Sequence, residues 1–141
     1  MLKNIFKKRK KNNNEDNNIL IASLLIHAAK IDENYSETEK KIITQAIMNL
    51  YNISLVKSQE ILKNAEKKEQ ESNQIIEFTR EIKKYPMEFR IKIIEIIWKI
   101  VYSDGKSDVY ESNLIRRICG LLYISDKDNG VIKERIRNQL K

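Results

Sequence analysis

Apolar residues recur along most of the chain at the three- and four-residue spacing of amphipathic helices, and the alternation typical of strands is almost absent. Glycine (three residues) and proline (one residue) are scarce, which also favours helices. The pattern predicts an all-α, single-domain bundle of about seven helices. Their expected ranges are 18–31, 36–51, 55–71, 73–84, 86–102, 108–123 and 125–140. The first and fifth helices carry their polar residues on one narrow stripe, so we expect both to cross the centre of the bundle.

A pattern of helix, acidic loop and helix occurs twice, and the second copy is shifted by 72 positions. Asp32 and Glu39 in the first loop correspond to Asp104 and Glu111 in the second. Two copies of a helix pair usually pack about a local two-fold axis, because neither copy buries its apolar face alone. We therefore expect an internally duplicated helix-loop-helix that brings both acidic loops to one side of the bundle.

The two glutamates of these loops have an interpretation that needs no ligand. Glu39 and Glu111 each stand three residues after a candidate helix N-cap, which is Ser36 in the first copy and Asp108 in the second. A carboxylate at that position accepts a hydrogen bond from a free backbone N–H and suits the positive end of the helix. Both glutamates are then helix caps.

The two aspartates favour a different interpretation. Asp32 and Asp104 each follow the C-terminal end of an apolar helix, where the helix dipole disfavours an anion. Polar turns do recruit aspartate, but a bound cation explains why the same placement occurs twice. Hard divalent cations such as Ca²⁺ or Mg²⁺ bind carboxylate oxygens. The candidate metal ligands are therefore Asp32, Glu39, Asp104 and Glu111, with helix capping as the alternative.

At these loops the chain resembles the tellurite-resistance TerB-like family. The resemblance rests on Asp104-Gly-Lys-Ser-Asp-Val-Tyr-Glu111 and on the degraded copy Asp32-Glu-Asn-Tyr-Ser-Glu-Thr-Glu39, and it covers approximately residues 19–128. It implies an all-α bundle with acidic residues in two loops, which in some relatives are linked to divalent metal. It also implies a role in stress-response or membrane-associated assemblies, with no established reaction. Glu33 stands where the family has glycine, so the first loop is expected to hold a weaker site or none.

The net charge of +7 is concentrated at the N-terminus. Residues 1–11 hold six lysines and arginines and no acid, whereas the other 130 residues carry only +1. This distribution predicts a basic, Asn-rich tail at residues 1–18 and a helical domain at residues 19–141, and it argues against nucleic acid as the partner. The tail either only solubilises the chain or contacts an anionic membrane surface through residues 1–11.

Few other residues offer chemistry. His27 and Cys119 are the only residues of their types, and we expect a partly buried structural histidine and a core cysteine in a reduced, cytosolic protein. Trp98 and Tyr102 are expected to pack rather than to bind a ligand. The sequence contains no glycine-rich phosphate loop, catalytic triad or cysteine pair, and no run of the roughly 20 apolar residues that a membrane span needs. The basic start leads into an Asn-rich stretch, so we expect no signal peptide.

These observations predict a TerB-like helical module of the bacterial cytoplasm that is not an enzyme. We expect it to bind a protein partner and a divalent cation, and to lie at the inner membrane where its tail binds lipid. Two alternatives stay open at this point. One is a structural adaptor without metal, and the other is a nucleic-acid binder that works through the basic tail.

Overall fold

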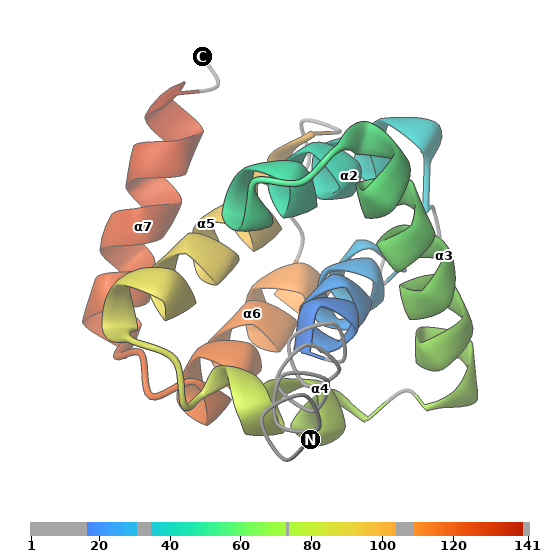
Figure 1. The fold of residues 1–141 in the computed structure, drawn as a ribbon. Helices are drawn as coiled ribbons and strands as arrows, with labels where there is room; N and C mark the ends of the chain where they lie inside the picture. The colour runs from blue at the N-terminus through green and yellow to red at the C-terminus, as the bar shows by residue number, and fades with distance from the viewer. Residues whose placement is uncertain (1–16, 31–34, 73, 104–108, 140–141) are drawn as a thin grey trace.

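The computed structural model describes residues 17–30, 35–72, 74–103 and 109–139, and it describes residues 109–111 by their backbone alone. Within these ranges the chain forms seven helices and no strands, which confirms the predicted all-α, single-domain bundle (Figure 1). The helices are a first helix at residues 17–30, α2 (Glu37–Tyr51), α3 (Leu55–Glu71), α4 (Ile75–Ile82), α5 (Met87–Tyr102), α6 (Val109–Leu121) and α7 (Asp126–Gln139).

The first helix lies in the middle of the bundle, with α2, α3, α4 and α6 around it (Figure 1). Ile21, Leu24 and Leu25 of this helix have no exposed surface, and neither have Ile93 and Ile97 of α5. A helix that is apolar on most of its circumference is stable in water only when other helices enclose it. The prediction that these two helices are central is confirmed.

Trp98 fixes α5 against α7. Its side chain is only 1% exposed, and its indole N–H donates a hydrogen bond to the Asn129 side-chain oxygen at 3.0 Å. The ring of Tyr102 stacks on the indole with 5.5 Å between ring centroids, and the Lys133 ammonium lies 5.4 Å from the centroid of the indole. The expected packing role of Trp98 is confirmed, and its single polar atom is satisfied within the protein.

Two apolar residues beside the buried faces of α4 and α7 are exposed. Ile76 is 50% exposed and Val131 is 59% exposed. The buried residues of these helices are Ile75, Phe78, Thr79 and Ile82 in α4, and Ile132 and Ile136 in α7. Each set follows helical spacing and defines one face, and a residue next to that face in sequence points about 100° away from it. Ile76 and Val131 are therefore exposed although they are apolar.

Helix α6 ends at Leu121, two residues before its predicted end at residue 123. The chain leaves the helix because Tyr123 adopts the left-handed conformation with a φ of 59°. The N–H group of Ile124 then bonds to the carbonyl oxygen of Cys119 at 2.9 Å, which closes the last turn. Tyrosine is a rare residue in this conformation, and therefore no local pattern marks the end of the helix there.

The turn between α2 and α3 has the same local geometry as the turn between α6 and α7. Asn52 is left-handed with a φ of 53°, and the N–H of Ile53 bonds to the Met48 carbonyl oxygen at 3.3 Å. Ser54 and Ser125 then cap the next helices, with their hydroxyl oxygens 3.2 and 3.1 Å from the N–H of the third residue. This likeness covers the turns alone. Duplication of the acidic helix-loop-helix stays a prediction.

Candidate functional site

The four predicted metal ligands are described only in part. Asp32 and Asp104 lie outside the described residues, and Glu111 is described by its backbone alone, which lies in the first turn of α6. Among the side chains that the structure describes, no group of three or more histidine, cysteine, aspartate or glutamate residues is arranged to hold a metal ion. The joint metal site at Asp32, Glu39, Asp104 and Glu111 stays a prediction.

Glu39 is described in full, and it caps α2. Its carboxylate accepts hydrogen bonds from the backbone N–H and from the hydroxyl group of Ser36, both at 3.1 Å. The Ser36 hydroxyl oxygen in turn accepts the backbone N–H of Glu39 at 3.2 Å. This reciprocal arrangement is the predicted capping box, and it explains why a glutamate with only 6% exposure is stable there. The capping interpretation is therefore confirmed for Glu39.

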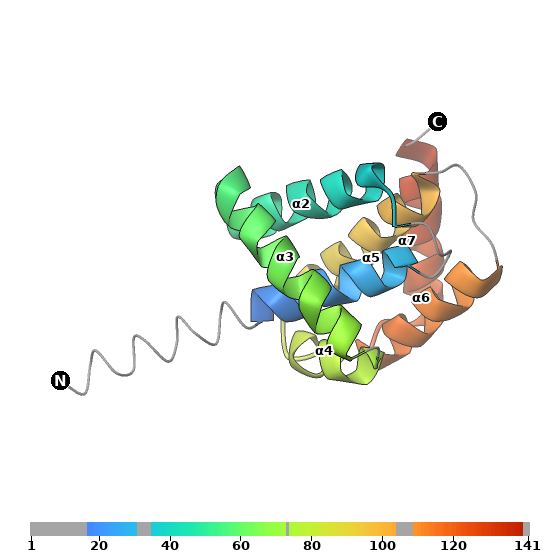
Figure 2. The same ribbon diagram turned by 90° about the vertical axis from the view of Figure 1, so that its right-hand side faces the viewer.

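The described helix ends next to the two acidic segments lie on the same side of the bundle. The end of the first helix and the start of α2 flank one segment, and the end of α5 and the start of α6 flank the other. All four ends lie toward the right-hand side in Figure 2. The four helix ends that flank the acidic segments therefore lie on one side of the described bundle.

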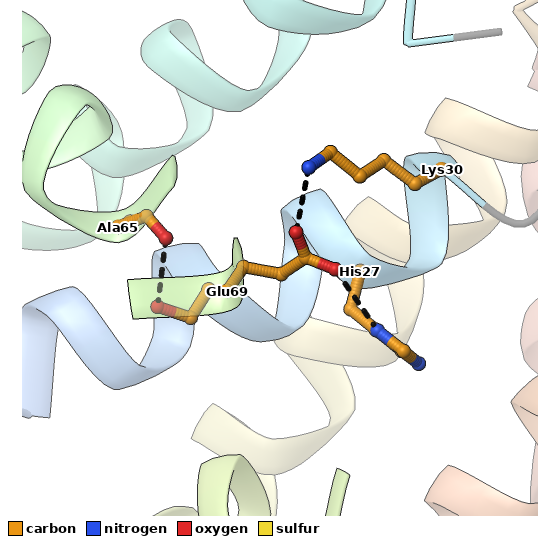
Figure 3. A network of polar contacts seen from close by, with 5 residues as sticks. His27, Lys30, Ala65 and Glu69 are labelled. Atoms are coloured by element: carbon orange, nitrogen blue, oxygen red, sulfur yellow. Dashed lines mark hydrogen bonds and ion pairs between the residues drawn. The ribbon is translucent and has the colours of Figure 1, made fainter. Parts of the chain in front are cut away.

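A buried polar network joins the first helix to α3 (Figure 3). Glu69 of α3 is 6% exposed, and its carboxylate accepts a hydrogen bond from the Lys30 ammonium at 2.6 Å. The Nδ1 atom of His27 lies 3.3 Å from the other carboxylate oxygen. The Ser23 hydroxyl, one helical turn before His27, lies 3.4 Å from the carbonyl oxygen of Ala65. The narrow polar stripe of the first helix therefore meets a matching polar edge of α3.

The network continues toward the start of α2 through Tyr35. The ammonium groups of Lys30 and Lys40 lie 5.9 and 5.0 Å from the centroid of its ring, within range of cation–π attraction. Burial and the negative charge of Glu66 raise the pKa of the Tyr35 hydroxyl, so it stays neutral. The basic and aromatic groups hold the end of the first helix beside the start of α2.

Glu69 is a buried charged residue that the sequence pattern did not predict. It lies in the highly charged second half of α3, where a glutamate is normally solvated. The polar residues at 23, 27 and 30 gave an indirect signal, because a polar stripe on a buried helix needs partners on a neighbouring helix. We assign the network a structural role, since Glu69 is held by Lys30 and His27 within the protein.

We expect the Glu69→Gln variant to lose about 1–2 kcal/mol of unfolding free energy, because the substitution removes the charge that Lys30 neutralises while keeping the size of the side chain. The matched control is Glu71→Gln in the same helix, where the side chain is exposed and we expect a change below about 0.5 kcal/mol. Urea unfolding followed by circular dichroism measures both. Equal losses in the two variants would show that the buried ion pair contributes nothing specific.

A groove of about 670 Å³ runs between α2 and α5, which lie side by side in Figures 1 and 2. Its apolar floor comes from Ile42, Ala46 and Leu50 of α2 and from Phe89 and Ile96 of α5. These positions recur at helical spacing on each wall, so the apolar surface continues along the groove. A continuous apolar groove of this kind is typical of a binding surface.

The polar edge of this groove is basic on both walls. Lys41 of α2 and Lys92 and Lys99 of α5 line it, and all three are exposed. Of the acids that the structure describes, Glu95 alone lines it, and its carboxylate is paired with Arg135 of α7. Among the described residues, no carboxylate forms an ion pair with any of the three lysines. The groove therefore presents positive charge around an apolar floor.

Cys119 has no nucleophilic character in this fold. It is fully buried in α6, and burial raises the pKa of its thiol to about 12, with a further contribution from the negative charge of Asp126. The thiolate is the reactive form of cysteine, and at neutral pH it is almost absent here. The prediction that Cys119 is a core residue is confirmed.

These features define a small helical module whose described surface offers a basic-edged apolar groove. The family model for the tellurite resistance protein TerB matches residues 18–134, and the chain belongs to this family. The resemblance noted in the acidic loops is thus confirmed over most of the chain. Searches of curated proteins and of solved structures find no match. None of the described helices has both the length and the apolar character needed to cross a lipid bilayer.

Proposed function

We propose that this TerB-family module acts by binding a protein partner rather than by catalysis, and that the groove between α2 and α5 is its binding surface. The observation that carries the proposal is the apolar floor between two rigid helices, which exposes Ile42, Leu50 and Phe89 to a ligand. Apolar surface exposed along a groove gains free energy when a partner covers it. We further propose that the module serves cytoplasmic, stress-related or membrane-associated assemblies.

Photo-crosslinking in native cells tests this function. A photoreactive phenylalanine replaces Gln45, an exposed residue at the groove, or Arg80, an exposed residue of α4 away from it. We expect discrete protein adducts from position 45 and none of the same size from position 80. Absence of protein adducts at position 45, or the same adducts from both positions, contradicts the proposal.

As a second function we propose divalent-cation binding by the acidic loops. The observation that favours it is that the four helix ends flanking the two acidic segments lie on the same side of the bundle (Figure 2). Asp32, Asp104 and Glu111 would supply carboxylate oxygens, and Glu39 would share its carboxylate between the cation and the cap of α2. Ca²⁺ and Mg²⁺ are the candidates, because both prefer oxygen ligands.

We also propose that the basic tail contacts anionic membrane surfaces. Removing residues 1–16 leaves the first helix intact from Asn17, whose side-chain amide donates a hydrogen bond to the Tyr85 hydroxyl at 3.2 Å. We therefore expect an unchanged melting temperature and a sharp loss of binding to phosphatidylserine vesicles, since each basic residue near such a surface contributes about 1 kcal/mol. Sedimentation with vesicles measures the binding. Equal binding by the full chain and the shortened chain would refute this role for the tail.

A further inference from the structure

We infer that the partner segment that occupies the groove between α2 and α5 is an acidic amphipathic helix. The inference rests on the proposed function, because it names the chemistry of the ligand for the same surface. It follows from three properties of the groove: its length, the state of the backbone along its walls, and its charge.

The length of the groove matches a short helix. Its lining on α2 extends from Thr38 to Leu50, which corresponds to about 18 Å at the helical rise of 1.5 Å per residue. A helix of three to four turns covers that distance. Its apolar residues at every third or fourth position would meet the apolar floor formed by Ile42, Ala46 and Leu50.

The backbone hydrogen bonding of the two groove walls excludes an extended peptide. Both walls are α-helices, whose backbone N–H and C=O groups bond within each helix. A strand laid on the apolar floor would bury its own backbone groups without hydrogen-bond partners, at a cost of several kcal/mol for each group in a fully apolar setting. A helical peptide satisfies its backbone internally and avoids this cost. The groove therefore selects a helix.

The charge of the groove selects an acidic ligand. Lys41, Lys92 and Lys99 stand on both sides of the floor, and the carboxylate of Glu95 is held by Arg135. A helix with glutamate or aspartate beside its apolar stripe would form ion pairs along both walls. The chain's own residues 1–11 carry six positive charges and would be repelled, and a second copy of the groove would bring lysine against lysine.

Nuclear magnetic resonance of the full-length chain, labelled with nitrogen-15, tests the inference. The probe is a synthetic amphipathic peptide of roughly 18 residues, a length at which an isolated helix is stable enough to study, with leucine on one face and glutamate elsewhere. A second peptide carries lysine in place of each glutamate. We expect the acidic peptide to shift amide signals of α2 and α5, and the basic peptide to leave them unchanged.

Charge reversal then tests the lysines themselves. We expect Lys92→Glu combined with Lys99→Glu to weaken binding of the acidic peptide about tenfold or more, since two attractive contacts become repulsive. The matched control combines Lys63→Glu and Lys127→Glu, two exposed lysines that do not line the groove, and we expect affinity within about twofold of the unchanged chain. Identical circular dichroism spectra establish that both variants are folded.

Four results of the peptide experiments would overturn the inference. They are shifts centred outside α2 and α5, equal binding of the acidic and basic peptides, no binding of either peptide, and equal weakening by both pairs of substitutions. Shifts in α2 and α5 on removal of residues 1–16 without peptide would assign the groove to the tail, and concentration-dependent self-association through these helices would assign it to a second copy. Protein adducts at position 45 together with any of these outcomes would leave the proposed function standing and remove only the acidic-helix ligand.

Discussion

Trp98→Ala is expected to lower the free energy of unfolding by about 3–5 kcal/mol, the usual range for removing a large buried aromatic side chain. The indole is 1% exposed, so the substitution opens a cavity between α5 and α7. It also removes the indole N–H that donates a hydrogen bond to the Asn129 side-chain oxygen, and it removes the ring over which the Lys133 ammonium lies. Guanidinium unfolding followed by circular dichroism measures the loss.

The control for this prediction is Val131→Ala in α7, which shortens an apolar side chain that is 59% exposed. We expect a change within about 0.5 kcal/mol, as for most surface substitutions. A loss below about 1 kcal/mol for Trp98→Ala would mean that the contact between α5 and α7 is dispensable, and that the indole belongs to a surface that opens readily. Such a result would contradict the central position of α5.

Most of the helical architecture could be predicted because local signals mark it. Helix α3 has the predicted bounds 55–71, since Ser54 provides a side-chain cap at its start. The end of α2 at Tyr51 was also predicted, and asparagine at position 52 readily adopts the left-handed turn that follows. At the end of α6 the same turn uses Tyr123. Tyrosine rarely adopts the left-handed conformation, so the predicted end of α6 was two residues too late.

The candidate surfaces were harder to predict because they depend on packing between distant segments. Glu69 lies 42 residues from His27 and 39 from Lys30 along the chain, so no local pattern joins them. Ile42 and Leu50 lie at helical spacing on one apolar face of α2. Periodicity shows that such a face exists, but it does not show whether another helix covers it. Only the arrangement of α2 against α5 shows that part of this face stays open.

The acidic repeat was predicted from spacing, and the structure settles only the role of Glu39 as a cap. That role is compatible with both interpretations of the loops, because a carboxylate that caps a helix still has oxygen lone pairs for a cation. The capping and metal interpretations differ instead at the aspartates, because each follows an apolar helix in sequence and the dipole at a helix C-terminus disfavours an anion. A test that changes Asp104 therefore separates them.

We expect divalent cations to stabilise the unchanged chain, and we expect Asp104→Asn to abolish this stabilisation. Binding to the folded state alone adds RT ln(1 + [L]/Kd), about 2.7 kcal/mol when the cation is at a hundredfold excess over Kd. Asparagine suits a polar turn as aspartate does but removes the charged ligand, so the free energy gained from Ca²⁺ or Mg²⁺ falls. Thermal melting with chelator and then with each cation measures the gain.

The repeat supplies the control for this measurement. Asp32→Asn is the corresponding change in the first loop, and we expect it to lose less of the cation-dependent stabilisation, because Glu33 already replaces the glycine that follows the aspartate in the second loop. Without cation, Asp104→Asn should be neutral or slightly stabilising, since it removes an anion from beside a helix C-terminus. If the unchanged chain melts at the same temperature with chelator, Ca²⁺ and Mg²⁺, the acidic loops serve as turns and helix caps. Protein binding at the groove between α2 and α5 would then be proposed without a cation site beside it.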